Sequence, residues 1–170
     1  MSAPLAASDT SAMILALAGK YRVEIDTGVG NTTTWTEVKG IKNFAPKSTQ
    51  TTEDDTDISS DGHASSYPVG QAWTADISGL TKGTGTDAAM VVDPGVQALL
   101  NASEEKGAAG IVHIRYWRTD SLPEAKEVYA TCEVTRDGEE PPALDKWSGT
   151  LTGRGKPINI TKPTEEDETP

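Results

Sequence analysis

The chain has 170 residues, which is enough for one domain with a single hydrophobic core. Leu, Ile, Val and Phe together make up 29 residues, about 17%, and the formal net charge is −11, values that by themselves are typical of disorder. However, nine of the acidic residues lie in two short segments, 53–61 and 165–168, and the rest of the chain is close to neutral. We therefore predict a folded body whose thin aliphatic core gains stability from association with other subunits.

The acidic balance also limits the partners of the chain. A negative surface disfavours tight binding to nucleic-acid phosphates or to anionic membranes, and no apolar run approaches the ~20 residues of a membrane span. Cys132 is the single cysteine, so it cannot form an internal disulfide, which favours synthesis in the cytoplasm. Because Cys132 alternates with Val128, Ala130 and Val134, we expect it in the core.

The first 18 residues form a predicted N-terminal docking arm. Its apolar side chains are too many to remain in water, because each buried aliphatic side chain contributes roughly 1.5 to 3 kcal/mol. Asp9 precedes this run where a signal peptide requires Lys or Arg, so we do not interpret it as a leader. We expect the arm to pack on a neighbouring subunit through Met13, Ile14, Leu15 and Leu17.

At least six strands follow. Tyr21, Val23 and Ile25 alternate with charged residues, and Trp73, Ala75 and Ile77 alternate with polar ones, as is typical of half-buried strands. The predicted strand segments are 21–26, 35–44, 72–78, 111–117, 127–134 and 147–153.

A long polar connection separates the second and third of these segments. Residues 45–68 contain few apolar side chains, and connections in compact domains usually have about four to six residues. We therefore predict a long loop that orders against an adjacent subunit or ring. Its acidic residues are Glu53, Asp54, Asp55, Asp57 and Asp61.

One helix is predicted after the third strand segment. Asp93 is an N-cap residue, Pro94 occupies the first helical position and Gly107 ends the pattern, while Leu99 and Leu100 lie on one face. One helix among many strands indicates a mainly β domain, either a β-sandwich or a strongly curved sheet with the helix packed on it. We assign residues 19–160 to this domain and residues 161–170 to an acidic, mobile tail.

Motifs that would indicate chemistry are incomplete. Asp57, Ser59 and Asp61 resemble the first half of a calcium loop, but Pro68 stands where a bidentate Glu should close the coordination sphere. Gly155-Lys156 resembles the end of a phosphate loop, but Pro157 follows where Ser or Thr is required. His63, His113 and Cys132 match no catalytic signature. We predict no enzyme activity, no catalytic residue, no metal and no cofactor.

The order of these segments resembles the tail tube protein (major tail protein) family of long-tailed bacteriophages. The resemblance covers roughly residues 15–160 and depends on order and spacing. The matching elements are the N-terminal arm, Trp35-x-x-Val38-x-Gly40-Ile41-x-x-Phe44, the long polar segment, Trp73, the single helix, Val112-x-Ile114-x-Tyr116 and Ser148-Gly-Thr-Leu-Thr-Gly153-x-Gly155-x-Pro157.

This resemblance implies that six subunits close into a ring and that rings stack into a tube in the virion tail. Their sheets would join into an inner β-barrel through which DNA passes at ejection without specific binding. The implied partners are other copies of the chain and the tape-measure, tail-tip and tail-terminator proteins. Arg22 and Arg115 are the opposing charges of the polar strand faces. The acidic candidates for the channel wall are Glu24, Asp26, Asp76, Glu127 and Glu133.

Three alternatives remain open at the level of sequence. The first is an immunoglobulin-like adhesion or carbohydrate-binding module that uses exposed Trp35, Trp117 or Trp147 for stacking. The second is a hydrolase with paired carboxylates between Asp54 and Asp61. The third is a related secretion-system tube.

Overall fold

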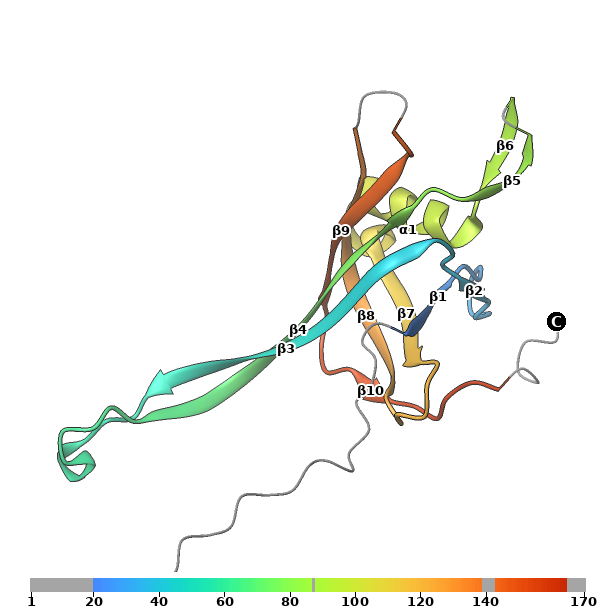
Figure 1. The fold of residues 1–170 in the computed structure, drawn as a ribbon. Coiled ribbons are helices and arrows are strands. Elements are labelled where there is room, and N and C mark those ends of the chain that lie inside the picture. The colour runs from blue at the N-terminus through green and yellow to red at the C-terminus, as the bar shows by residue number, and fades with distance from the viewer. Residues whose placement is uncertain (1–19, 87, 139–142, 165–170) are drawn as a thin grey trace, which may run out of the picture.

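The computed structural model describes residues 20–86, 88–138 and 143–164. Its main feature is an antiparallel sheet of eight strands, ordered β2, β1, β7, β8, β9, β4, β3, with β10 beside β8 (Figure 1). The prediction of a mainly β fold with at least six strands and one helix is confirmed. The strands are β1 (Tyr21–Asp26), β2 (Trp35–Glu37), β3 (Ile41–Asp54), β4 (Ser66–Leu80), β5 (Gly83–Thr86), β6 (Ala89–Val92), β7 (Ile111–Arg118), β8 (Ala125–Asp137), β9 (Lys146–Gly153) and β10 (Ile158–Asn159).

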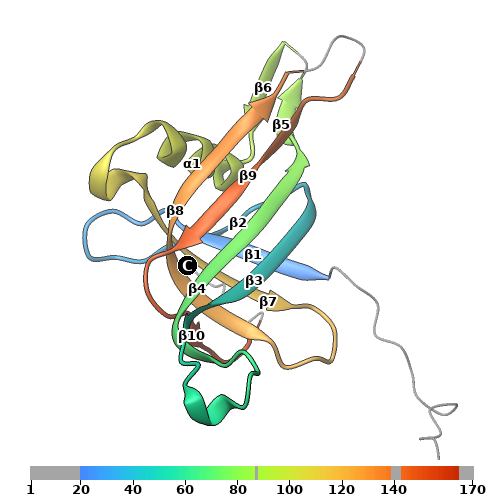
Figure 2. The same ribbon diagram turned by 90° about the vertical axis from the view of Figure 1, so that its left-hand side faces the viewer.

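The main sheet curls so that its two ends approach each other. Phe44 of the edge strand β3 lies 5.5 Å from Tyr21 of β1 and 5.0 Å from Tyr116 of β7, measured between ring centroids. Trp73 of β4 stacks on Tyr116 and donates a hydrogen bond from Nε1 to its hydroxyl at 3.1 Å. Burial raises the pKa of Tyr116 to about 12, so this phenol stays neutral. Of the two predicted architectures, the strongly curved sheet is therefore the observed one (Figure 2).

The helix α1 (Pro94–Glu104) closes the core against β8. It begins as predicted, because the Asp93 carboxylate accepts a hydrogen bond from the Val96 amide at 3.2 Å. Val96, Leu99 and Leu100 are buried. Buried Cys132 donates from Sγ to the Leu99 carbonyl at 3.3 Å, which agrees with its expected place in the core. The helix ends before Gly107, the residue expected to terminate it, and Gly107 instead begins a 3₁₀ turn (Gly107–Gly110) with φ of 67°.

The predicted loop over residues 45–68 is wrong, because most of this segment forms a long β-hairpin. β3 and β4 pair from Phe44 opposite Ile77 to Asp54 opposite Ser66, and the outer part extends away from the body as a two-stranded ribbon (Figure 1). Its side chains are exposed on both faces, so no apolar alternation marks it in the sequence. The ribbon satisfies its backbone by strand pairing, and its many Thr residues suit extended structure. The turn between the strands contains a short 3₁₀ helix, Ile58–Ser60.

A small second sheet was not predicted, and the two predicted terminal segments are largely outside the described residues. β5 and β6 form a separate two-stranded sheet, which the sequence does not indicate because β5 consists of Gly and Thr. The predicted docking arm, residues 1–18, and most of the predicted tail, residues 165–170, lie outside the described residues.

Candidate functional site

The five candidate channel carboxylates lie on one face of the main sheet. Strand register places Arg115 between Glu24 and Glu127, and Thr150 between Glu133 and Asp76. Asp26 shares this face because it is two residues from Glu24 on the same strand. The opposite face carries the core residues, such as Ile114, Val128 and Leu151. We call the first face the polar face.

Glu24 is on the polar face but is almost fully buried, at 2% exposure. It accepts a hydrogen bond from Arg115 Nε at 2.6 Å and lies 3.3 Å from Arg22 Nε. Arg115 in turn lies over the rings of Trp35 and Trp117, at 4.6 and 5.6 Å from their centroids. Glu24 therefore holds a packed Arg and Trp cluster together. The sequence does not indicate this role, because no local pattern distinguishes a buried carboxylate in a strand.

A second cluster surrounds His113. Its Nε2 lies 2.6 Å from Glu127 Oε1 and its Nδ1 lies 3.5 Å from Asp26 Oδ2, while its ring stacks on Tyr129 at 4.1 Å. Burial opposes ionisation of Asp26, but hydrogen bonds from the Thr34 and Gly28 amides and from His113 together hold its pKa below the usual value. These contacts fix Asp26 and Glu127 on the polar face, where each is only partly exposed.

The other two candidate carboxylates are more accessible. Asp76 forms an ion pair with Lys47, which lowers the pKa of the carboxyl, and it accepts a hydrogen bond from Thr150 Oγ1 at 3.2 Å. Glu133 is exposed near the middle of β8. Of the five candidates, Glu133 is therefore the one whose position suits it best to act as a surface charge.

The hairpin tip, residues 53–65, carries the five acidic residues predicted to contact a neighbour. Its backbone is ordered by local hydrogen bonds: Asp57 accepts from the Ser59 amide at 2.8 Å, and Asp54 accepts from the Thr56 amide at 2.9 Å. Asp57 thereby caps the 3₁₀ turn. Among the described residues, no group of three or more His, Cys, Asp or Glu side chains has the arrangement of a metal site. Ile58 is fully exposed at the outer end of this hairpin.

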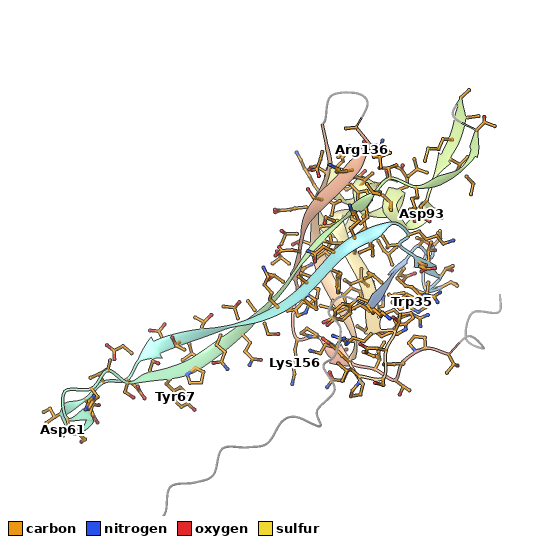
Figure 3. The ribbon with its side chains drawn as sticks, viewed as in Figure 1. Trp35, Asp61, Tyr67, Asp93, Arg136 and Lys156 are labelled. Atoms are coloured by element: carbon orange, nitrogen blue, oxygen red, sulfur yellow. The ribbon has the colours of Figure 1, made fainter. Side chains whose placement is uncertain are left out.

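The surfaces expected for the alternative functions differ from those observed. Trp117 and Trp147 are buried, so the proposal that they form exposed stacking platforms is wrong. Trp35 is partly buried and packs on His113 at 4.8 Å. The carboxylates between Asp54 and Asp61 lie on an exposed ribbon (Figure 3), which does not provide the concave pocket that a hydrolase site requires. In the part of the chain that the structure describes, no helix is long and apolar enough to cross a membrane.

The described chain thus combines a curved antiparallel sheet, one packed helix, a polar sheet face and a long protruding hairpin. The structure is similar to that of the tail of an empty GTA particle, which was computed with C6 symmetry, with a TM-score of 0.64 and 11% identity over 86% of this chain and 100% of that chain. It is also similar to the SPP1 tail tube, a hybrid of solid-state NMR and cryo EM, with a TM-score of 0.63 and 11% identity over 89% of this chain and 83% of that chain. No protein-family model and no curated protein matches the sequence. The predicted resemblance to tail tube proteins is thus confirmed by the fold.

Proposed function

We propose that the chain is the structural subunit of a phage tail tube and acts in the virion tail. Six copies close into a ring, rings stack, and the channel conducts DNA during ejection. The observation that carries this proposal is the similarity in fold to two tail tubes over most of the chain. The C6 symmetry of the GTA tail supports six as the number of copies in a ring.

The open ends of the main sheet support ring closure. The edge strand β3 has 14 residues and pairs on one side with β4, while the other end of the sheet is the three-residue strand β2. A long unpaired edge promotes uncontrolled pairing unless a partner covers it. In a ring, the β3 edge of each copy would pair with the β2 edge of the next copy. Because this heterologous contact repeats around the closed ring, no sheet edge remains free.

The polar face is the surface best suited to line the channel. Its carboxylates outnumber its cations, with Glu24, Asp26, Glu37, Asp76, Glu127, Glu133 and Asp137 opposed by Arg22, Lys47, Arg115 and Lys146. Sixfold repetition turns exposed Glu133 into a ring of six negative charges, which repels phosphates and lets DNA slide. Because Glu24 is buried between two arginines, we assign it a structural part in this wall rather than contact with DNA.

The two protruding segments support contacts between subunits. The side chains of the outer β3–β4 hairpin are exposed, and we propose that this hairpin packs against the next ring. The arm at residues 1–18 packs on a neighbour through its apolar side chains. Tape-measure, tail-tip and tail-terminator proteins would complete the tail. None of these contacts calls for a catalytic residue, so the proposed role is purely structural.

Analytical ultracentrifugation over a range of protein concentrations tests this proposal. A tube subunit should convert from monomer to hexamer-sized and much larger species as its concentration rises. An adhesion module should sediment as a monomer at every concentration and bind glycans. Monomeric behaviour up to millimolar concentration would exclude the tube function.

A further inference from the structure

We propose that the hairpin tip of one copy docks into a basic pocket beside the start of α1 on a copy in the next ring. This inference rests on the proposed tube function, because stacking of rings brings the two surfaces together. It goes beyond that function by naming the surface that receives the tip.

The tip combines negative charge with one exposed apolar side chain. Ile58 is fully exposed, and His63 is also exposed in the tip. Five acidic residues lie within five positions of Ile58 in the sequence: Glu53, Asp54, Asp55, Asp57 and Asp61. A bare isoleucine at the end of a ribbon is costly in water, since burying such a side chain is worth roughly 1.5 to 3 kcal/mol. The local hydrogen bonds of Asp54 and Asp57 present Ile58 on an ordered turn, so little conformational entropy is lost on docking.

The basic pocket has the complementary character. It has a volume of about 280 Å³ and is lined by Lys39, Lys82, Val91, Val92, Asp93 and Pro94. Both lysines are exposed, and Lys82 approaches Gly40, next to Lys39. The Asp93 carboxylate accepts hydrogen bonds from the Lys39 and Val96 amides, both at 3.2 Å, so it is occupied by the helix cap. The pocket therefore offers apolar side chains to Ile58 and two ammonium groups to the carboxylates of the tip.

The two surfaces lie at opposite ends of the same pair of strands. The pocket adjoins Gly40, just before β3 begins, and the tip follows Asp54, where β3 ends. Figure 3 places Asp61 at the outer end of the long hairpin and Asp93 on the body, on the side away from that hairpin. Fourteen extended residues span roughly 45 Å, so a contact between tip and pocket joins copies head to tail along the hairpin direction. Such a heterologous contact extends an assembly without limit.

The walls of the pocket also point to a missing partner. β5 and β6 form an isolated two-stranded sheet, which is marginal in water without further packing. Met90 and Val91 of β6 are nevertheless exposed, at 47% and 66%. A docked tip would cover the Val91 side of this hairpin, which accounts for apolar residues at the end of the molecule opposite to the long hairpin (Figure 1).

Charge reversal in the full-length protein tests the contact. The tip variant carries Glu53→Lys and Asp55→Lys; Asp57 and Asp61 are kept because Asp57 caps the turn and Asp61 has a left-handed backbone with φ of 49°. The pocket variant carries Lys39→Glu and Lys82→Glu. A control for the pocket variant carries Lys106→Glu and Lys156→Glu, which make the same Lys-to-Glu change at two other exposed positions. Each variant is checked for an unchanged monomer melting temperature, and rings and tubes are counted by negative-stain electron microscopy.

We expect the tip and pocket variants to form rings that do not stack, the control to form tubes, and a chain with both reversals to recover tubes. Ile58→Ser should raise the concentration needed for half-maximal polymerisation about tenfold, whereas Val29→Ser, at another exposed position, should not change it. Normal tubes from either reversed variant, loss of the rings themselves, or no recovery in the combined chain would overturn the contact while leaving the tube function intact. Wild-type protein that forms neither rings nor tubes would overturn both.

Discussion

Replacing Glu24 tests whether this carboxylate supports the polar face from within rather than acting as a channel charge. Its side chain is 3% exposed and that of Arg115 is 13% exposed, with the carboxylate 2.6 Å from Arg115 Nε. Glu24→Ala leaves Arg115 buried over Trp35 without its acceptor. Removing one partner of a buried pair costs about 3 to 5 kcal/mol.

For Glu24→Ala the lower end of this range, about 3 kcal/mol, applies. Arg22, the second cation near Glu24, is 29% exposed and can be solvated in part. We therefore expect a loss of about 3 kcal/mol in the free energy of unfolding. For a domain of this size the melting temperature should fall by about 6 to 12 °C. The matched control is Glu133→Ala on the same face, where an exposed position should change stability by no more than about 0.5 kcal/mol.

The assay is urea unfolding of dilute, monomeric protein at pH 7, followed by tryptophan fluorescence, because Trp35 and Trp117 lie against the cluster. Equal stability of the Glu24 and Glu133 variants would refute the structural role of Glu24. A Glu24 variant that is stable but conducts DNA abnormally would instead make it a channel charge.

Four further outcomes are expected. Residues 51–70 can be replaced by an Asn-Gly turn, because Gln50 and Gln71 already face each other across the ribbon. The monomer melting temperature should be unchanged and tubes should be absent. Normal tubes would contradict the role of the hairpin. Removing residues 1–18 should impair polymerisation far more than monomer melting, and the reverse result would show that the arm completes its own core. The hydrogen bond and charge of Arg118 lower the pKa of Asp120 from 3.8 to about 2. The stabilisation by ionised Asp120 is therefore present above about pH 4 and is lost towards pH 2. Asp120→Asn should make the free energy of unfolding less dependent on pH in that window, and an unchanged pH dependence would contradict the role of this ion pair. Glu133→Lys should slow DNA passage most at low salt, whereas Glu133→Gln should have a smaller effect; equal rates would exclude a channel position.

Alternation in the sequence predicted the parts of the fold in which one strand face is buried. Val23 and Ile25, or Trp73, Ala75 and Ile77, repeat every second residue because their neighbours face away from the core. The helix start was predictable because Asp93 and Pro94 act locally. The outer part of the β3–β4 hairpin was not, because neither of its faces is buried and its order depends on pairing across the ribbon.

The sequence predicted that the five candidate carboxylates lie on polar strand faces, but it did not predict their individual environments. Alternation alone assigned the five candidate carboxylates to the polar faces of their strands, and the strand register shows that they share one face of the sheet. Their different environments arise from residues distant in sequence: Glu24 meets Arg115, and Asp76 meets Lys47. The basic pocket likewise joins Lys39 with Lys82 across the chain, so no local motif marks it.

Cryo-electron microscopy of the concentrated, purified protein tests the central proposal most directly. We predict tubes of stacked sixfold rings in which the polar face, with Glu133, lines the channel and α1 lies towards the outside. Protein that remains monomeric at every concentration, or tubes with α1 on the channel wall and the five carboxylates on the outer surface around a basic lumen, would contradict the proposal.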